Sequence, residues 1–201
     1  MIGELDGRFC ITLERVDREA QEEASLIERA IAGERVAING LISRYRQRVV
    51  RLATHILRRP EEAEDVAQEA FIRAFRNLHT FRGQGRFYTW LYQIVVRICL
   101  DRKDLRRWDS ELPLENFTAG LADEERPLEN VQARIMVESL LEKLSPPMRA
   151  MLVLRELEGL EYEEIAQVLQ IPVGRVKWRL HTARAQFREL WQKAIQEVEH
   201  V

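Results

Sequence analysis

Cysteine, proline and glycine are all scarce in this chain of 201 residues, which has two, six and nine of them. Cys10 and Cys99 lie far apart, so they form neither a disulfide framework nor the paired spacing of a zinc site. So few cysteines fit a reducing, cytoplasmic setting. The scarcity of glycine and proline favours long helices.

Long hydrophobic runs are also missing. No segment approaches the ~20 apolar residues of a membrane span. The first residues, "MIGELDGRFC", contain acids and are not followed by the apolar run of a signal peptide. With 46% hydrophobic and 32% charged residues, the composition is typical of a soluble globular chain with one average domain or two small ones.

Patterns that carry catalysis are likewise absent. The four histidines, His55, His79, His181 and His200, are scattered. The sequence has no His/Cys ligand cluster, no nucleotide-binding glycine loop and no paired catalytic constellation. We therefore expect a protein that is not an enzyme and that has no metal, no cofactor and no small-molecule substrate.

What the sequence does contain is helical periodicity. Apolar residues recur with period 3.6 over residues 25–57, where Gly33 and Gly40 mark a break or a kink. Pro60 suits the first turn of a new helix, which ends near Asn77. A further helix is predicted from about residue 88 to residue 107.

A change in charge divides the chain. Residues 109–132 hold seven acids against one base, together with prolines and a glycine, which is typical of a linker. Helical periodicity returns at Val131, and a later helix is expected to begin around Pro146 and end at Gly159.

The predicted fold is therefore all-α, with two small helical domains joined by a flexible acidic linker. The expected bounds are residues 25–108 for the first domain, 109–130 for the linker and 131–201 for the second domain. The first 24 residues have weak patterning and are expected to form a mobile arm.

The stretch "YEEIAQVLQIPVGRVKWRL", residues 162–180, has the layout of a helix-turn-helix. The turn carries Gln170 where glycine is usual, because the backbone there is left-handed. The inner faces of the two helices are predicted to consist of Ile165, Ala166, Leu169, Val176, Leu180, Ala183 and Phe187.

A helical wheel places Trp178 opposite the inner face of the second helix. Basic residues flank it, which suits a major groove, because the flanks can hold phosphates while the tip meets base edges. The alternative is a solvated basic helix in a bundle. The positions that flank it directly are Arg175, His181, Thr182 and Ala185, and those at the edges of this face are Lys177, Arg179 and Arg184.

The predicted N-terminal domain has two candidate surfaces. The segment "FRGQGRFYTWLYQI", residues 81–94, interleaves aromatics with arginines around two glycines and is typical of a platform for unstacked bases. Within it, Trp90 is expected to pack in the core. The segment "EEAEDVAQEAF", residues 61–71, is acidic and then apolar, so it is either a solvated face or a face that docks a protein.

Four segments in order resemble the bacterial extracytoplasmic-function sigma factors, close to the sigma E type. They are "EDVAQEAFIRAF", "FRGQGRFYTWLYQI", "LEKLSPPMRAMLVLRELEGLEYEEIAQVL" and "IPVGRVKWRLHTAR", and together they span about residues 25–191. The resemblance implies a region 2 domain and a region 4 domain, binding to core RNA polymerase and promoter DNA, and promoter-specific initiation of transcription. It also implies an anti-sigma factor as a partner, which we expect to be membrane-linked.

The resemblance assigns roles by position. The segment that docks on polymerase matches Asp65, Gln68, Glu69 and Phe71. The loop and platform that capture the −10 element match Phe81, Arg82, Gln84, Arg86, Phe87, Tyr88, Trp90, Ile94 and Arg97. The helix that recognises the −35 element matches Arg175, Lys177, Trp178, Arg179, His181, Thr182 and Arg184, with Arg149 and Arg155 as phosphate partners.

The sequence departs from sigma E-like proteins at three of these positions. Arg97 stands where they often carry asparagine, Trp178 replaces a small polar residue, and Thr182 replaces a frequent arginine. A different promoter preference is therefore expected. The competing function is a stand-alone helix-turn-helix repressor or activator, which would have to dimerise and would not need the docking stretch at residues 65–71.

Overall fold

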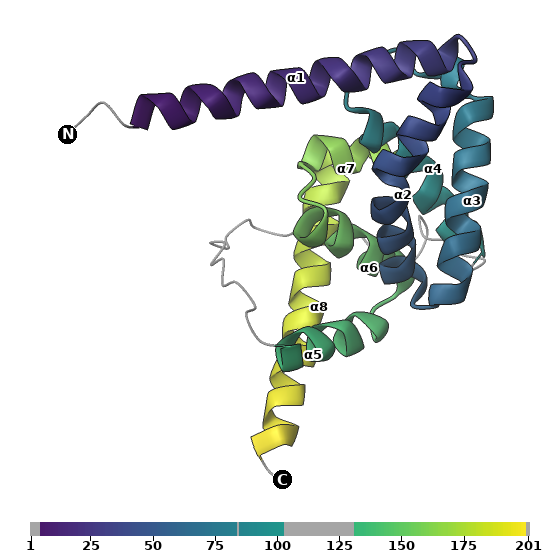
Figure 1. The fold of residues 1–201 in the computed structure, drawn as a ribbon. Coiled ribbons are helices and arrows are strands. Elements are labelled where there is room, and N and C mark those ends of the chain that lie inside the picture. Colours follow the sequence, from purple (N-terminus) through teal and green to yellow (C-terminus); the bar gives the residue numbers. More distant parts are fainter. Residues whose placement is uncertain (1–4, 84, 103–130, 200–201) are drawn as a thin grey trace.

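The computed structural model describes the backbone of residues 5–83, 85–102 and 131–199 (Figure 1). Side chains are described for residues 18–83, 85–102 and 135–196. Every regular element in these ranges is a helix, as the sequence predicts. The predicted linker and Gln84 lie outside the described residues.

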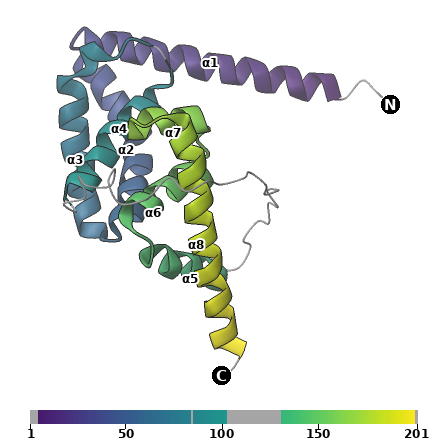
Figure 2. The same cartoon turned by 180° about the vertical axis from the view of Figure 1, so that it is seen from behind.

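The N-terminal half consists of α1 (Leu5–Ile31), α2 (Arg35–Leu57), α3 (Pro60–Arg76), a 3-10 turn η1 (Leu78–Thr80) and α4 (Phe87–Arg102). α3 begins at the predicted proline and ends one residue before the predicted Asn77. Figures 1 and 2 show α2, α3 and α4 side by side, while the N-terminal end of α1 projects away from them.

The sequence pattern predicts a mobile arm and no helix before residue 25. Helix α1 instead begins at Leu5. Of the two glycines expected to interrupt the pattern, Gly33 does so with φ +86° between α1 and α2. Gly40 lies within the uninterrupted α2, where an added Cβ would come within 3.2 Å of Leu26, so the glycine allows α1 and α2 to pack closely.

The core of this half comes from the apolar stripes that the periodicity predicts. Leu41, Leu52 and Ile56 on α2 and Leu91 and Val95 on α4 are fully buried. Burial of each such side chain stabilises the fold by about 1.5–3 kcal/mol relative to exposure. The stripes therefore hold α2, α3 and α4 together as a rigid support for the segments between them.

The C-terminal half consists of α5 (Val131–Glu142), α6 (Pro146–Leu152), a π-helical turn η2 (Val153–Leu157), α7 (Tyr162–Leu169) and α8 (Val173–Glu199). The prolines at the start of α6 and Gly159 after η2 stand at the predicted boundaries. α7 begins with a capping box in which the carboxylates of Glu161 and Glu164 accept from backbone N–H groups of the first turn.

The two halves pack directly against each other, which the sequence analysis did not predict. α4 lies against α7, and α2 lies against α6 and η2 (Figures 1 and 2). The helix-turn-helix is therefore in contact with the aromatic loop region of the N-terminal half.

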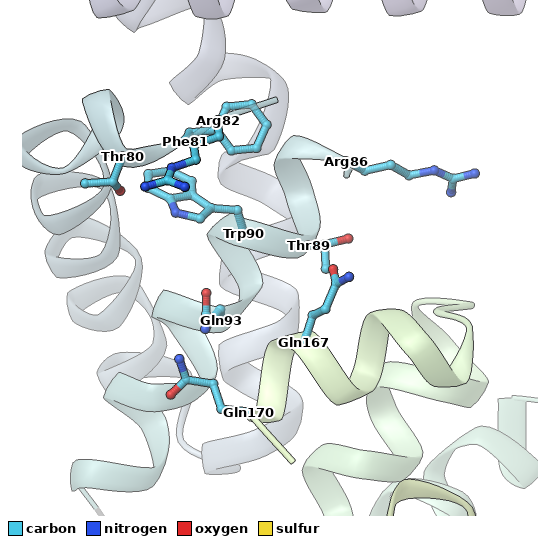
Figure 3. Close-up of a pocket in the computed structure, with 9 residues that line it drawn as sticks. All are labelled: Thr80, Phe81, Arg82, Arg86, Thr89, Trp90, Gln93, Gln167 and Gln170. Carbon is cyan, nitrogen blue, oxygen red and sulfur yellow. The ribbon is translucent and has the colours of Figure 1, made fainter. Parts of the chain in front are cut away.

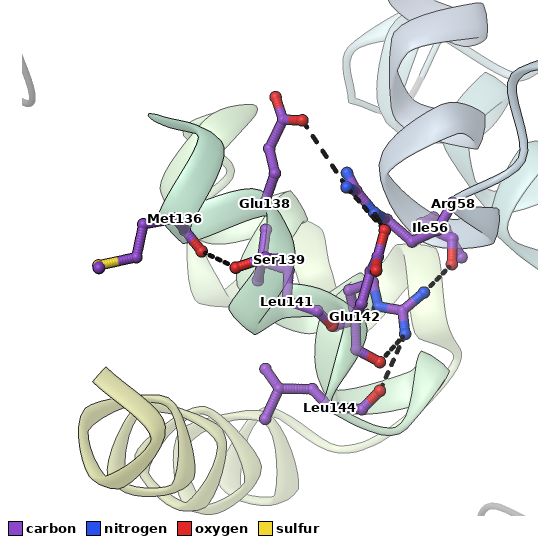
Figure 4. Close-up of polar contacts among 9 residues, drawn as sticks. Ile56, Arg58, Met136, Glu138, Ser139, Leu141, Glu142 and Leu144 are labelled. Atoms are coloured by element: carbon purple, nitrogen blue, oxygen red, sulfur yellow. Dashed lines mark hydrogen bonds and ion pairs between the residues drawn. The ribbon is translucent and has the colours of Figure 1, made fainter. Parts of the chain in front are cut away.

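Arg149 on α6 anchors this packing, and its acceptor residues Ile56, Leu141, Glu142 and Leu144 are labelled in Figure 4. Its guanidinium is buried and donates hydrogen bonds of 2.7–3.0 Å to the carbonyls of Leu141, Glu142 and Leu144, at the end of α5. It also donates a 2.8 Å bond to the carbonyl of Ile56 on α2. These carbonyls lie at the C-terminal ends of helices, where no backbone N–H of the same helix is left to donate to them.

None of the described helices is long and apolar enough to span a membrane.

Candidate nucleic-acid interface

The outer face of α3 carries the predicted protein-docking residues. Asp65 and Gln68 are exposed, and Glu69 forms ion pairs with Arg73 and, at 3.2 Å, with Arg102. The carboxylate of Glu69 is therefore already neutralised within the chain, whereas Asp65 projects into solvent.

Phe71 does not lie on this outer face, although the sequence analysis places it with the docking residues. Its side chain is only 7% exposed, and its ring stacks on Phe75 at 6.1 Å. The exposed apolar residue is its neighbour Ile72, at 54%. Ile72 follows Asp65 by seven positions and Gln68 by four, so helical spacing alone could have identified it.

The loop between η1 and α4 leads into an aromatic cluster. The ring centroid of Phe81 lies 5.5 Å from that of Phe87, in an edge-to-face arrangement, and 5.7 Å from that of Trp90. Phe87 is buried, whereas Phe81 and Trp90 are half-buried. Phe87 thus belongs to the core, and the other two rings lie at its surface.

A cavity of about 420 Å³ opens beside these rings. Figure 3 shows side chains from the loop, from α4 and from α7 around it. Its lining combines aromatic faces, two guanidinium groups and amides, which is the set of groups that holds a single nucleic-acid strand. The lining residues are Thr80, Phe81, Arg82, Arg86, Thr89, Trp90, Gln93, Gln167 and Gln170.

The predicted basic residues of this region have different surroundings. Arg82 and Arg97 are exposed. Arg86 donates a 2.7 Å hydrogen bond to the hydroxyl of Tyr88, while Ile94 and Arg97 line a second cavity of about 360 Å³. Gln93 borders both cavities but was not singled out from the sequence, because one glutamine in a helix carries no pattern.

The helix-turn-helix has the predicted inner face. Val176, Leu180 and Ala183 on α8 and Ile165 on α7 are at most 1% exposed. Gln170 has the left-handed backbone expected for this turn, with φ +55°. The crossing of α7 and α8 is thus the one that the pattern predicts.

The outer side of α8 is covered more than the wheel predicts. Trp178 and His181 are half-buried, and Arg179 is only 5% exposed instead of lying at the solvent edge. The reason is that α8 packs against α5 and α6 as well as α7, whereas the wheel considers a single helix crossing. Lys177 remains exposed, with its ammonium 6.0 Å from the ring centroid of Tyr162.

The other candidates for −35 contacts are held by neighbouring groups. Arg184 donates two hydrogen bonds, of 3.0 and 2.8 Å, to the carboxylate of Glu156. Arg155 donates to the carbonyl of Leu160 and forms an ion pair with Glu161 at 3.0 Å. Thr182 donates to the carbonyl of Trp178, and Arg175 is half-buried.

Arg149 is the candidate whose surroundings differ most from those expected of a phosphate partner. All of its hydrogen-bonding nitrogens are engaged by the four carbonyls described above. Burial lowers the pKa of its guanidinium. In this arrangement it stabilises helix ends and does not face solvent.

Two protein-family models match this chain, one in each half. Sigma-70 region 2 matches residues 41–109, and Sigma-70 region 4 matches residues 134–187. The RNA polymerase sigma-H factor of Pseudomonas aeruginosa is 35% identical over 88% of this chain and 97% of its own length. The ECF RNA polymerase sigma-E factor of Escherichia coli is 36% identical over 79% of this chain and 88% of its own.

Solved structures share the fold. CnrH, solved with the cytosolic domain of CnrY, is 24% identical and has a TM-score of 0.63 over 84% of this chain and 96% of its own. The sigma factor RpoE of Bartonella quintana, solved with the anti-sigma factor NepR, is 20% identical and has a TM-score of 0.58 over 77% of this chain and 96% of its own.

A region 2 followed by a helix-turn-helix region 4 defines a transcription initiation factor of the sigma-70 class. With these relatives, the chain belongs to the extracytoplasmic-function sigma factors of bacterial RNA polymerase. Its partners in initiation are core RNA polymerase and promoter DNA.

Proposed function

We propose that this sigma factor binds core polymerase, the −10 strand and the −35 duplex through three separate surfaces. The outer face of α3, with Asp65, Gln68 and Ile72, docks on core polymerase. The loop at residues 81–87 and the adjoining face of α4 capture the melted −10 strand. The exposed side of α8 contacts the −35 duplex. We also propose the domain bounds expected from the sequence, residues 25–108 and 131–201, although α1 runs across residue 25.

The observation that carries this proposal is the cavity of about 420 Å³ beside Phe81, Arg82 and Trp90. A base that leaves the stack requires an apolar face to replace its neighbours and a cation near its phosphate. This cavity offers both, at the position where sigma E-like proteins capture a base.

For α8 to bind the −35 duplex, some of its cationic side chains must leave their present partners. Lys177 is exposed, but Arg179 is buried and Arg184 is paired with Glu156. A DNA phosphate near Arg184 can replace the carboxylate of Glu156, because exposed ion pairs contribute only about 0–1 kcal/mol. Assignment of Trp178, His181 and Thr182 to base contacts remains a prediction.

A second proposal concerns a protein partner. An anti-sigma factor that binds across both domains would hold the factor inactive, and we infer that this protein is linked to the membrane while the sigma factor itself is cytoplasmic. Purification of the tagged chain from unstressed native cells should recover such a protein. Recovery of polymerase alone would contradict the partner but not the sigma activity.

The decisive assay is transcription in vitro with purified core polymerase and genomic promoter fragments. The chain should direct specific transcripts that core polymerase alone does not make, without any catalytic group of its own. A stand-alone repressor or activator would instead bind duplex DNA without polymerase and produce no such transcripts. Phe81→Ala should reduce open complexes, detected with permanganate, more than closed complexes, detected by gel shift.

A further inference from the structure

A polar cavity distinct from the two beside the aromatic loop lies between α2, the start of α4 and the residues at the end of η2. Its volume is about 290 Å³. Ligand pockets commonly span about 300–1,000 Å³, so this cavity suits a small ligand. The lining residues are Arg48, Arg51, Arg86, Tyr88, Tyr92, Leu157, Glu158 and Gly159.

Three guanidinium groups give this cavity its positive charge. Arg48 and Arg51 are exposed and share one face of α2, because they are three positions apart. The side chain of Arg86 extends away from the rings of Phe81 and Trp90 (Figure 3) and borders this cavity as well. Among the described residues, Arg48 has no hydrogen bond and no ion pair, so its N–H donors are available to a ligand.

Two tyrosines of α4 add hydroxyl groups to the lining. The side chain of Tyr92 is buried, which raises the pKa of its hydroxyl and keeps it protonated. This hydroxyl donates a 2.6 Å hydrogen bond to Glu158. The hydroxyl of Tyr88 accepts a 2.7 Å hydrogen bond from Arg86. These bonds fix the position of one cation and of the one carboxylate that line the cavity.

Carboxylates offset only part of the positive charge. Glu158 pairs with Arg51 at 3.4 Å, and both of its oxygens are engaged, since the other accepts from Tyr92. Outside the lining, Glu164 on α7 lies 4.0 Å from Arg86. Three cationic side chains thus face one carboxylate in the lining, and they still outnumber the carboxylates when Glu164 is included. The cavity therefore favours an anionic ligand.

We propose that this cavity binds a short polyphosphate chain, the group that inorganic polyphosphate and nucleoside triphosphates share. Guanidinium groups bind phosphate oxygens through paired N–H donors and remain charged at physiological pH. Arg48 is the principal contact, and Arg51 and Arg86 complete the site. Arg86 is shared with the proposed −10 surface, whereas Arg48 and Arg51 belong to none of the three surfaces of the proposed function.

The main test is calorimetric titration of the full-length chain with sodium tripolyphosphate in magnesium-free buffer. Wild type should bind, and its melting temperature should rise with ligand concentration, because the ligand stabilises the folded state that binds it. Arg48→Gln should bind roughly tenfold more weakly, about the effect of losing one hydrogen bond between charged groups. Absence of binding to wild type would overturn the proposal.

Arg35→Gln is the matched control for Arg48→Gln. It removes the same charge from an exposed position on the same helix, about 20 Å away along the helix axis. Charges are screened over about 8 Å at physiological salt, so the affinity should change by less than about twofold. Equal losses of affinity in Arg35→Gln and Arg48→Gln would indicate general charge attraction and would also overturn the proposal.

A substitution of Glu158 provides a test with the opposite sign. Glu158→Gln removes the carboxylate from the cavity, while the amide oxygen can still accept from Tyr92. Tripolyphosphate should then bind roughly tenfold more tightly, because one charge repulsion is lost. Glu163→Gln, at an exposed position on α7, is the control and should leave the affinity within about twofold. Unchanged or weaker binding in Glu158→Gln would place the ligand outside this cavity.

Further titrations identify the source of the phosphate chain. Tighter binding of adenosine or guanosine triphosphate than of tripolyphosphate would identify a nucleotide as the ligand, and equal or weaker binding would identify the inorganic chain. The third probe is a mixed-sequence single-stranded DNA. If Arg48→Gln weakens the binding of this DNA alone, and tripolyphosphate does not displace it, the cavity belongs to the −10 surface and the proposal is wrong.

Discussion

The outer face of α3 and the strand-binding side of α4 are neighbours in the fold but differ in what covers them. Asp65, Gln68 and Ile72 on α3 are exposed. On α4, by contrast, Tyr88 and Thr89 donate hydrogen bonds to Glu164 of the other half. The proposed polymerase surface is thus open to solvent, while part of the proposed −10 surface contacts the other half of the chain.

The outer side of α8 is also partly covered by other residues of the chain. Four cationic residues and a histidine lie within residues 174–184, in a chain with a net charge of −2. Arg179 is buried and Arg184 is paired with Glu156. Part of each proposed DNA surface is therefore engaged by the protein itself, which limits binding to stray DNA without a strongly acidic overall charge.

The largest expected effect is on the free energy of unfolding and concerns Phe71, which lies on the side of α3 that faces the core. Phe71→Ala should lower the free energy of unfolding by about 3 kcal/mol or more, because it removes a buried ring stacked on Phe75. Chemical denaturation measures this directly. Unchanged stability together with weaker polymerase binding would mean that Phe71 is the docking anchor after all.

Arg149→Ala should be nearly as destabilising, by about 2–3 kcal/mol, because four helix-end carbonyls lose a buried donor. The measurement is denaturation of the free chain, followed by −35 binding at a temperature where the variant is folded. If stability holds and only DNA binding falls, Arg149 contacts phosphate as the sequence predicts.

Ile72→Ala should leave the free energy of unfolding within about 0.5 kcal/mol of wild type, because the side chain is exposed. Its affinity for core polymerase should fall by about 1–2 kcal/mol, as for an apolar contact at an interface. Val36→Ala, at an exposed position in the first turn of α2, is the matched control. Equal affinities for Ile72→Ala and wild type would remove the outer face of α3 from the interface.

The smallest effect concerns pH. Burial lowers the pKa of His55 on α2, which is surrounded by Arg51, Arg58, Glu138 and Glu158. Since the unfolded imidazole titrates near 6.5, its contribution to stability is present above that pH and is lost as pH falls below it. Because the ring is partly solvated, the loss should stay below about 1 kcal/mol. Denaturation at pH 7.5 and 5.5 should show a smaller difference for His55→Gln than for wild type.

Much of the fold follows from local pattern. Helical spacing predicts α2, α3 and the crossing of α7 and α8, because each uses an apolar stripe that is visible over a few turns. The proline at the start of α3 and the left-handed turn at Gln170 follow from backbone stereochemistry. Those features depend only on nearby residues, which is why the sequence is sufficient for them.

The remaining features depend on contacts distant in sequence. Arg149 is buried because its partners are backbone carbonyls, one of them 93 residues away on α2. Every residue has a backbone carbonyl, so the pattern of residue types does not indicate such partners. Phe71 is buried and Ile72 is exposed because the direction of the α3 stripe is set by α2 and α4. The contact of Glu158 and Glu164 with α4 depends on how two domains meet, which neither domain's periodicity specifies.

The most direct test of the packing between the two halves is a distance between them. Dyes attached at Ser43→Cys and Gln186→Cys, both exposed positions on α2 and α8, report it by energy transfer. Cys10→Ser removes one native thiol; Cys99 can stay, because burial raises its pKa to about 12 and keeps it unreactive. We predict high transfer in the free chain, because α4 packs against α7 and α2 packs against α6. Low transfer in the free chain would contradict the account.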